Sequence, residues 1–225
     1  MTTPEVRAEL ELPAGTVSTA WVAPADPVAT LVLGHGAGAG MDHPFMAGFS
    51  RAISDEGVAT LRFNFPYVER GRRSPDPERV LREAWLGAFE AGVARSDGRA
   101  VLAGGKSLGG RIASMCVADG MAAAGLVFLG YPLHPPGKPE RIRDEHLYRI
   151  QVPLLFLHGT SDPFATPELL RKVIAKLGTR AEDVPVEGGD HSFNVKGRKR
   201  DAREVGAELA AVVAPFVRRV ADGFR

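Results

Sequence analysis

The chain has 225 residues and a formal net charge of +1, with 44% hydrophobic and 24% charged residues. These values exclude a strongly charged binding surface over the whole chain, and they predict one globular domain spanning residues 1–225. The only cysteine, Cys116, excludes an internal disulfide. We expect no signal peptide, no membrane-spanning segment, no nucleic-acid or membrane partner, and a cytoplasmic location; the oligomeric state is left open.

The N-terminal segment differs in pattern from the rest of the chain. Residues 5–12 alternate between polar and apolar side chains, residues 13–15 form a Pro-Ala-Gly turn signal, and residues 16–22 are again typical of an extended strand. The sequence therefore predicts an antiparallel hairpin at one edge of a sheet.

Beyond residue 27, short apolar runs alternate with longer segments of helical period. Strands are predicted over 28–33, 58–65, 99–103, 126–129, 152–158 and 183–187. Helices are predicted over 43–56, along the face of Leu81, Trp85 and Phe89, after residue 107, and over 167–177 and 201–220, with a kink or break expected at Pro215. This alternation predicts an α/β fold with a mostly parallel, doubly wound sheet and helices on both faces.

The segment Gly105-Lys106-Ser107-Leu108-Gly109 fits the pattern G-x-S-x-G. It follows an apolar strand and opens an amphipathic helix, which is the strand–turn–helix setting of a nucleophilic serine. Glycines two positions before and after Ser107 relieve the clashes of so tight a turn, although glycines here could also serve close helix–strand packing. A phosphate-binding P-loop is excluded because Ala100 stands where that motif needs glycine.

A serine hydroxyl needs a neighbouring base to become nucleophilic. His191 lies in the glycine-containing loop after the last predicted strand and is the candidate base. Asp162, in the loop after the preceding strand, is the candidate acid that orients the imidazole. Asp190 is a rival acid, but as the residue next to His191 it is poorly placed to reach that ring. The chain order serine, aspartate, histidine is that of the α/β-hydrolases.

Catalysis at Ser107 also requires backbone donors where negative charge develops. We predict that the N–H groups of Leu108 and Ala37 form this oxyanion hole. Ala37 belongs to the glycine-rich loop 34–40 that follows the first buried strand. The same glycines resemble part of a dinucleotide-binding fingerprint, but no register completes it.

Four blocks of sequence carry a family resemblance: GHGAG at 34–38, FNFP at 63–66, GGKSLGGR at 104–111 and GYPLHPPG at 130–137. Over residues 28–215 the chain resembles the α/β-hydrolase superfamily. Within it, the chain resembles the small predicted hydrolases of the KANL/Tex-type branch, which is similar to dienelactone hydrolases. Those enzymes use a cysteine nucleophile where this chain has serine. The resemblance implies no cofactor, and the histidines lack the spacing of a metal site.

The resemblance places any helical lid at residues 131–150, a segment of four prolines and many charges that predicts a loop with one short helix. We therefore expect a minimal lid or none, and a serine hydrolase that forms an acyl-enzyme with a small-molecule acyl ester or thioester. The sequence does not decide between ester, thioester, lactone and amide. It also leaves open whether basic side chains at Arg70, Arg72, Arg73 and 196–200 attract an anionic substrate, and whether His134 and His146 line the pocket.

A function of another class remains as the alternative. Some relatives of this family are subunits of chromatin complexes, so the fold alone does not guarantee turnover. The chain would then act mainly as a protein-interaction module.

Overall fold

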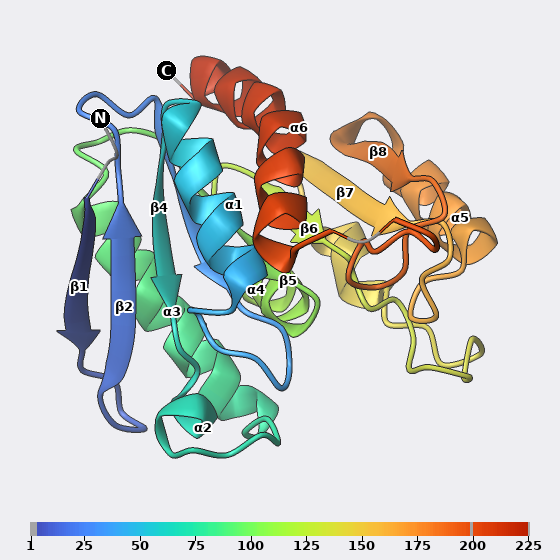
Figure 1. The fold of residues 1–225 in the computed structure, drawn as a ribbon, viewed down its shortest axis with the longest axis horizontal. Helices are drawn as coiled ribbons and strands as arrows, with labels where there is room; N and C mark the ends of the chain where they lie inside the picture. Colours follow the sequence, from blue (N-terminus) through green and yellow to red (C-terminus); the bar gives the residue numbers. More distant parts are fainter. Residues whose placement is uncertain (1–3, 199, 225) are drawn as a thin grey trace.

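The computed structural model describes residues 4–198 and 200–224. Its centre is an eight-stranded sheet with the order β1-β2-β4-β3-β5-β6-β7-β8 (Figure 1). The strands are β1 (Glu5–Leu10), β2 (Val17–Val22), β3 (Ala29–Gly34), β4 (Val58–Phe63), β5 (Val101–Lys106), β6 (Leu126–Leu129), β7 (Leu154–Gly159) and β8 (Ala181–Val186). β1 and β2 are antiparallel to each other, β2 is antiparallel to β4, and every other pair is parallel. The predicted α/β class and N-terminal hairpin are confirmed.

Helices cover both faces of the sheet, as a doubly wound fold requires (Figure 1). One face carries α1 (Pro44–Asp55) and α6 (Ala202–Gly223), and the other carries α3 (Glu78–Ala94), α4 (Leu108–Ala118) and α5 (Pro167–Leu177). The remaining helical elements are short: α2 (Pro66–Glu69) and the 3₁₀ helices η1 (Glu145–Arg149) and η2 (Gly178–Arg180).

The two-residue period of a strand divides β3 between the two layers. Leu31 and Leu33 pack with Phe49 of α1, whereas Val32 packs with Trp85 of α3. All of these side chains are fully buried. The unbroken apolar run of this strand is therefore what a central parallel strand with helices on both faces needs.

Several strand boundaries differ from those predicted, and those of β5 and β8 are examples with a clear cause. β5 continues past Ala103 to Lys106, because Gly105 pairs with Gly34 of β3 and Lys106 with Leu129 of β6. The tight turn is thereby confined to the residue that follows. β8 begins at Ala181, two residues earlier than expected, where it pairs with Leu154 at the start of β7.

The break expected at Pro215 is wrong. α6 runs from Ala202 to Gly223 without interruption. Residues on both sides of the proline, including Ala214, Phe216 and Val217, are buried in the layer between the sheet and α1. Their burial offsets the hydrogen bond that proline cannot donate.

The position of a possible lid contains little structure. Within residues 131–153, all of which the structure describes, η1 is the only helical element. The expectation of a loop with one short helix is confirmed. No helix in the described ranges is both long enough and apolar enough to cross a bilayer.

Candidate active site

Ser107 occupies the single residue between β5 and α4. Its backbone is strained, with φ of 49° and ψ of −111°, values that non-glycine residues adopt rarely. A Cβ atom at Gly105 or at Gly109 would lie 2.1 Å from the carbonyl oxygen of Gly34. Glycine is therefore needed on both sides of the serine, but the obstacle is the end of the neighbouring strand β3, which is the close packing that the sequence offered as the alternative to a clash within the turn.

The structure brings Ser107, His191 and Asp162 together from three separate loops. The Oγ of Ser107 lies 2.8 Å from Nε2 of His191, and Nδ1 of the same ring lies 2.7 Å from Oδ2 of Asp162. Each of these loops follows a parallel strand of the sheet, β5, β8 and β7 respectively. Carboxyl ends of parallel strands meet at one edge, so residues far apart in sequence become neighbours.

Asp162 is buried and both of its oxygens accept hydrogen bonds. Oδ1 accepts the backbone N–H of Phe164 at 2.7 Å, and Oδ2 faces the imidazole. The Phe164 ring packs on that imidazole with centroids 4.2 Å apart. The rival carboxylate, Asp190, instead accepts the backbone N–H of Ser192 at 2.8 Å and shapes the loop.

The predicted oxyanion donors lie beside the serine. Leu108 is the first residue of α4, and the first N–H groups of a helix have no partner within it. Ala37 lines the same cavity as Ser107 and His191. Its neighbour Gly36 approaches so closely that an added Cβ would lie 3.7 Å from Cβ of Ser107. The loop 34–40 therefore borders the nucleophile, as the sequence predicts.

His35 has a structural role that the sequence analysis missed. The ring is fully buried: Nε2 accepts the backbone N–H of Phe65 at 3.1 Å, so the proton on Nδ1 is donated to the carbonyl of Gly36 at 2.9 Å. Burial lowers the pKa of His35 to about 4, which keeps the ring neutral. It thus holds the start of the loop that carries Ala37.

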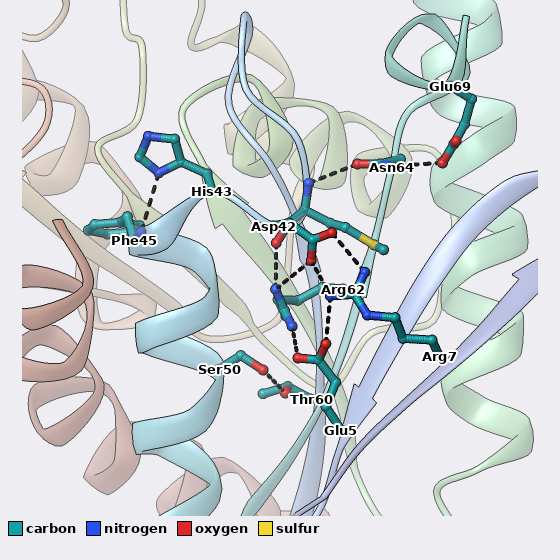
Figure 2. A network of polar contacts seen from close by, with 11 residues as sticks. Glu5, Arg7, Asp42, His43, Phe45, Ser50, Thr60, Arg62, Asn64 and Glu69 are labelled. Carbon is teal, nitrogen blue, oxygen red and sulfur yellow. Dashed lines mark hydrogen bonds and ion pairs between the residues drawn. The ribbon is translucent and has the colours of Figure 1, made fainter. Parts of the chain in front are cut away.

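The far end of this loop is held by a polar network around β4 (Figure 2). The N–H of Met41 donates to Asn64 at 2.8 Å, and its carbonyl accepts from the guanidinium of Arg62 at 2.5 Å. Arg62 is fully buried and also pairs with Glu5 of β1 and with Asp42. Burial lowers the pKa of Arg62, and these two carboxylates oppose that shift. Both ends of the loop are therefore anchored to neighbouring strands.

A cavity of about 500 Å³ opens above the serine. Its apolar wall consists of Ala37, Ala39, Phe45, Met46, Phe164 and Ala202. Its polar side chains are His43, Lys106, Ser107, His191, Ser192 and Asn194. No carboxylate lies among the lining residues of the described chain. Phe45, Phe164 and Lys106 are parts of the site that sequence reasoning did not assign.

Several charged residues singled out in the sequence lie elsewhere. Arg70 and Arg72 both pair with the buried carboxylate of Asp76. Neither these arginines nor His134 and His146 line the cavity. In the described ranges no three side chains of His, Cys, Asp or Glu gather as a metal site would require.

Comparison with known proteins gives a consistent result. The family model described as an alpha/beta hydrolase domain matches residues 27–219. Among solved structures, a serine hydrolase without a lid from Xanthomonas campestris is 19% identical, with a TM-score of 0.73 and 96% of each chain covered. A dienelactone hydrolase from Anabaena variabilis is 18% identical, with a TM-score of 0.72 and 94% of this chain and 97% of that chain covered. A serine hydrolase homologue from Coxiella burnetii is 18% identical, with a TM-score of 0.74, covering 96% and 98%. At such identities these structures establish the fold.

Proposed function

This chain belongs to the alpha/beta hydrolase domain family, and we propose that it is a serine hydrolase that cleaves a small acyl ester or thioester. Ser107 is the nucleophile, His191 the general base and acid, and Asp162 the carboxylate that orients the imidazole. A substrate of this kind needs no cofactor, because the protein supplies the nucleophile, the proton carrier and the anion site.

One observation carries the proposal. Two hydrogen bonds of 2.8 and 2.7 Å join the serine hydroxyl, both nitrogens of one imidazole and a buried carboxylate. Because Asp162 accepts from Nδ1, the lone pair of Nε2 faces the hydroxyl of Ser107, which is the tautomer that general-base catalysis requires. A module that only binds a partner has no need of these three hydrogen-bonded groups at the base of a cavity.

The geometry supports a two-step reaction. Nε2 of His191 takes the proton of Ser107 as the oxygen attacks the acyl carbonyl, and the imidazolium then protonates the departing alcohol or thiol. The backbone N–H groups of Leu108 and Ala37 stabilise the negative oxygen of the tetrahedral intermediate. Water, activated by the same imidazole, attacks the acyl-enzyme and releases the acid while Ser107 recovers its proton.

The cavity favours a short acyl group. Its wall of alanine, Phe45, Met46 and Phe164 offers apolar contacts close to the serine, in a cavity of about 500 Å³. The described segment 131–153 adds no α-helix that would extend the wall into a deep tunnel. A long acyl chain would leave part of its apolar surface in water, and that part would add little to the free energy of binding.

A fluorophosphonate probe tests the proposal directly. We expect the purified protein to gain the mass of one phosphonyl group, and the Ser107→Ala variant to gain none, because only a serine next to a working base attacks phosphorus at a useful rate. Intact-protein mass spectrometry reads the result, and Ser192→Ala, which keeps the nucleophile, is the matched control. If well-folded protein is not labelled, the hydrolase proposal fails and the interaction-module alternative takes its place.

The size of the cavity predicts the preferred chain length. Across p-nitrophenyl esters, kcat/KM is expected to be highest for acetyl to butyryl groups and about 10-fold or more lower for dodecanoyl and longer groups. The comparison uses ester concentrations below micelle formation, so that aggregation does not limit the long substrates. A preference for long acyl groups would contradict the proposed substrate class.

A further inference from the structure

Lys106 lies directly beside the candidate base, although it belongs to a strand and His191 to a distant loop. It is the last residue of β5 and its side chain lines the cavity with Ser107 and His191. Its ammonium donates a hydrogen bond to the backbone carbonyl of His191 at 2.6 Å, bridging 85 positions of sequence. Both the ammonium and the imidazole border Gly130, where an added Cβ would lie 3.2 Å from Nζ and 3.6 Å from Cε1 of the ring. A side chain at position 130 would therefore crowd both the ammonium and the imidazole.

The loop that Lys106 contacts is strained. Phe193, two residues after the histidine, has φ of 66°, which is unfavourable for a bulky side chain. Such strain persists only where the surroundings restrain the backbone. The ammonium lies 5.6 Å from the centroid of the Phe193 ring, within the range of a cation–π interaction. The same ring stacks on Phe45 at 6.0 Å. Lys106 thus contacts the loop on both sides of Ser192.

Almost all interactions of the Lys106 ammonium are with the loop that carries His191 and Phe193. None of the ion pairs of the described residues includes it, and the carbonyl of His191 is the one hydrogen-bond acceptor that the structure gives it. The carboxylates of Asp162 and Asp190 face it from the two loops and favour its charged form, but burial prevails and lowers the pKa of Lys106 to about 8. A partly buried cation without a paired carboxylate carries a cost, which argues for a use beyond packing.

We propose that Lys106 is a positioning residue, whose ammonium holds the His191 loop by its main chain and thereby keeps the imidazole between Ser107 and Asp162. The inference rests on the proposed function of this site. It adds Lys106 to the three side chains of the proposed triad. Unlike the serine and the histidine, Lys106 takes no part in bond formation or proton transfer and acts through the backbone of the base.

A dependence on pH follows from the charge state. Below about pH 8 the lysine is an ammonium, which donates a strong, charge-assisted hydrogen bond and attracts the Phe193 ring. Above that pH it becomes a neutral amine, both interactions weaken, and the loop loses its restraint. The acylation rate should therefore fall on the alkaline side, with a midpoint near pH 8.

Three proteins and two controls test the inference. The fluorophosphonate acylation rate and the kcat and KM for a butyryl ester are measured between pH 6 and pH 10 for the wild type, Lys106→Arg and Lys106→Met. Arginine stays charged throughout this range, and methionine keeps the length of the stem without the charge. Lys172→Met, on the exposed face of α5, is the control for loss of a lysine. The spontaneous hydrolysis of each reagent is subtracted at every pH.

We expect a fall above about pH 8 in the wild type and no such fall in either variant. At pH 7, Lys106→Met should lower kcat about 10-fold with KM nearly unchanged, because methionine keeps an apolar stem at the cavity wall and removes only the contact of the ammonium with the loop of the base. Its urea midpoint should stay the same or rise, since a partly buried charge without a paired carboxylate has been removed. A purely structural lysine would give the opposite: a lower midpoint and an unaltered pH profile.

The inference is overturned if the wild type shows no alkaline step, or if Lys106→Arg keeps that step. It is also overturned if Lys106→Met reacts like the wild type. Should Lys106→Met fail to fold, the profiles of the wild type and of Lys106→Arg still decide. The proposed function fails separately, by the absence of any labelling at Ser107, so the two outcomes are distinguishable.

Discussion

Replacing Ser107 by alanine is expected to lower kcat for a butyryl ester by about 10⁵-fold, with little change in KM. The acyl-enzyme cannot form without the hydroxyl, and the oxyanion hole and the cavity leave only a small residual rate. The double variant Ser107→Ala, His191→Gln is expected to be no slower than the single one. The reason is that, in the proposed mechanism, every proton the imidazole moves belongs to a step that needs the hydroxyl of Ser107, which lies 2.8 Å from Nε2.

Steady-state kinetics on the two single variants and the double variant check this expectation. Far-ultraviolet circular dichroism and urea unfolding control for the fold, because neither side chain is among the buried apolar residues that stabilise it. If the double variant loses activity in proportion to the product of the two single losses, then Ser107 and His191 act independently. The proposed relay would be wrong in that case.

The second large effect concerns stability. Gly105→Ala is expected to lower the free energy of unfolding by about 4 kcal/mol, of which roughly half is backbone strain and half is overpacking. The residue has φ of 150°, and a Cβ would meet the carbonyl oxygen of Gly34 at 2.1 Å. Both β3 and β5 are central strands of the sheet, so neither can move aside without disturbing its other neighbour.

Gly120→Ala is the matched control, because Gly120 also has a positive φ, of 109°, but nothing within 4 Å of an added Cβ. It should cost about 2 kcal/mol, the strain alone. Urea denaturation at pH 7 measures both variants. Equal losses would mean that the clash with Gly34 is relieved by small shifts, and that the tight packing at the turn is not what makes glycine necessary there.

Much of the fold follows from short-range patterns. The alternation of apolar runs and helical segments predicted the parallel sheet, since a buried parallel strand must be apolar on both faces, as Leu31 and Val32 are. The positions of Ser107, Asp162 and His191, after β5, β7 and β8, also follow from the sequence pattern, because the carboxyl ends of parallel strands lie at one edge. The ends of strands were harder to predict. Lys106 belongs to β5 because it pairs with Leu129 of β6, and the sequence around Lys106 does not reveal that partner.

Pro215 is a second position at which a rule based on local sequence gave the wrong expectation. The local rule that proline breaks a helix is a statement about one hydrogen bond and one clash. In α6 the buried neighbours Ala214 and Phe216 keep the helix continuous, and their burial depends on α1 and the sheet, which come from distant parts of the chain.

The sequence by itself determined the order of the elements, the glycines of the serine turn and the candidate nucleophile, base and acid, because each depends on steric or periodic rules that act within a few residues. Only the tertiary structure decided what these residues touch. It placed the carbonyl of Gly34 against Gly105, the ring of His35 against the carbonyl of Gly36 and the ammonium of Lys106 on the carbonyl of His191. These contacts depend on the packing of strands and loops that lie far apart in sequence, for which no local pattern exists.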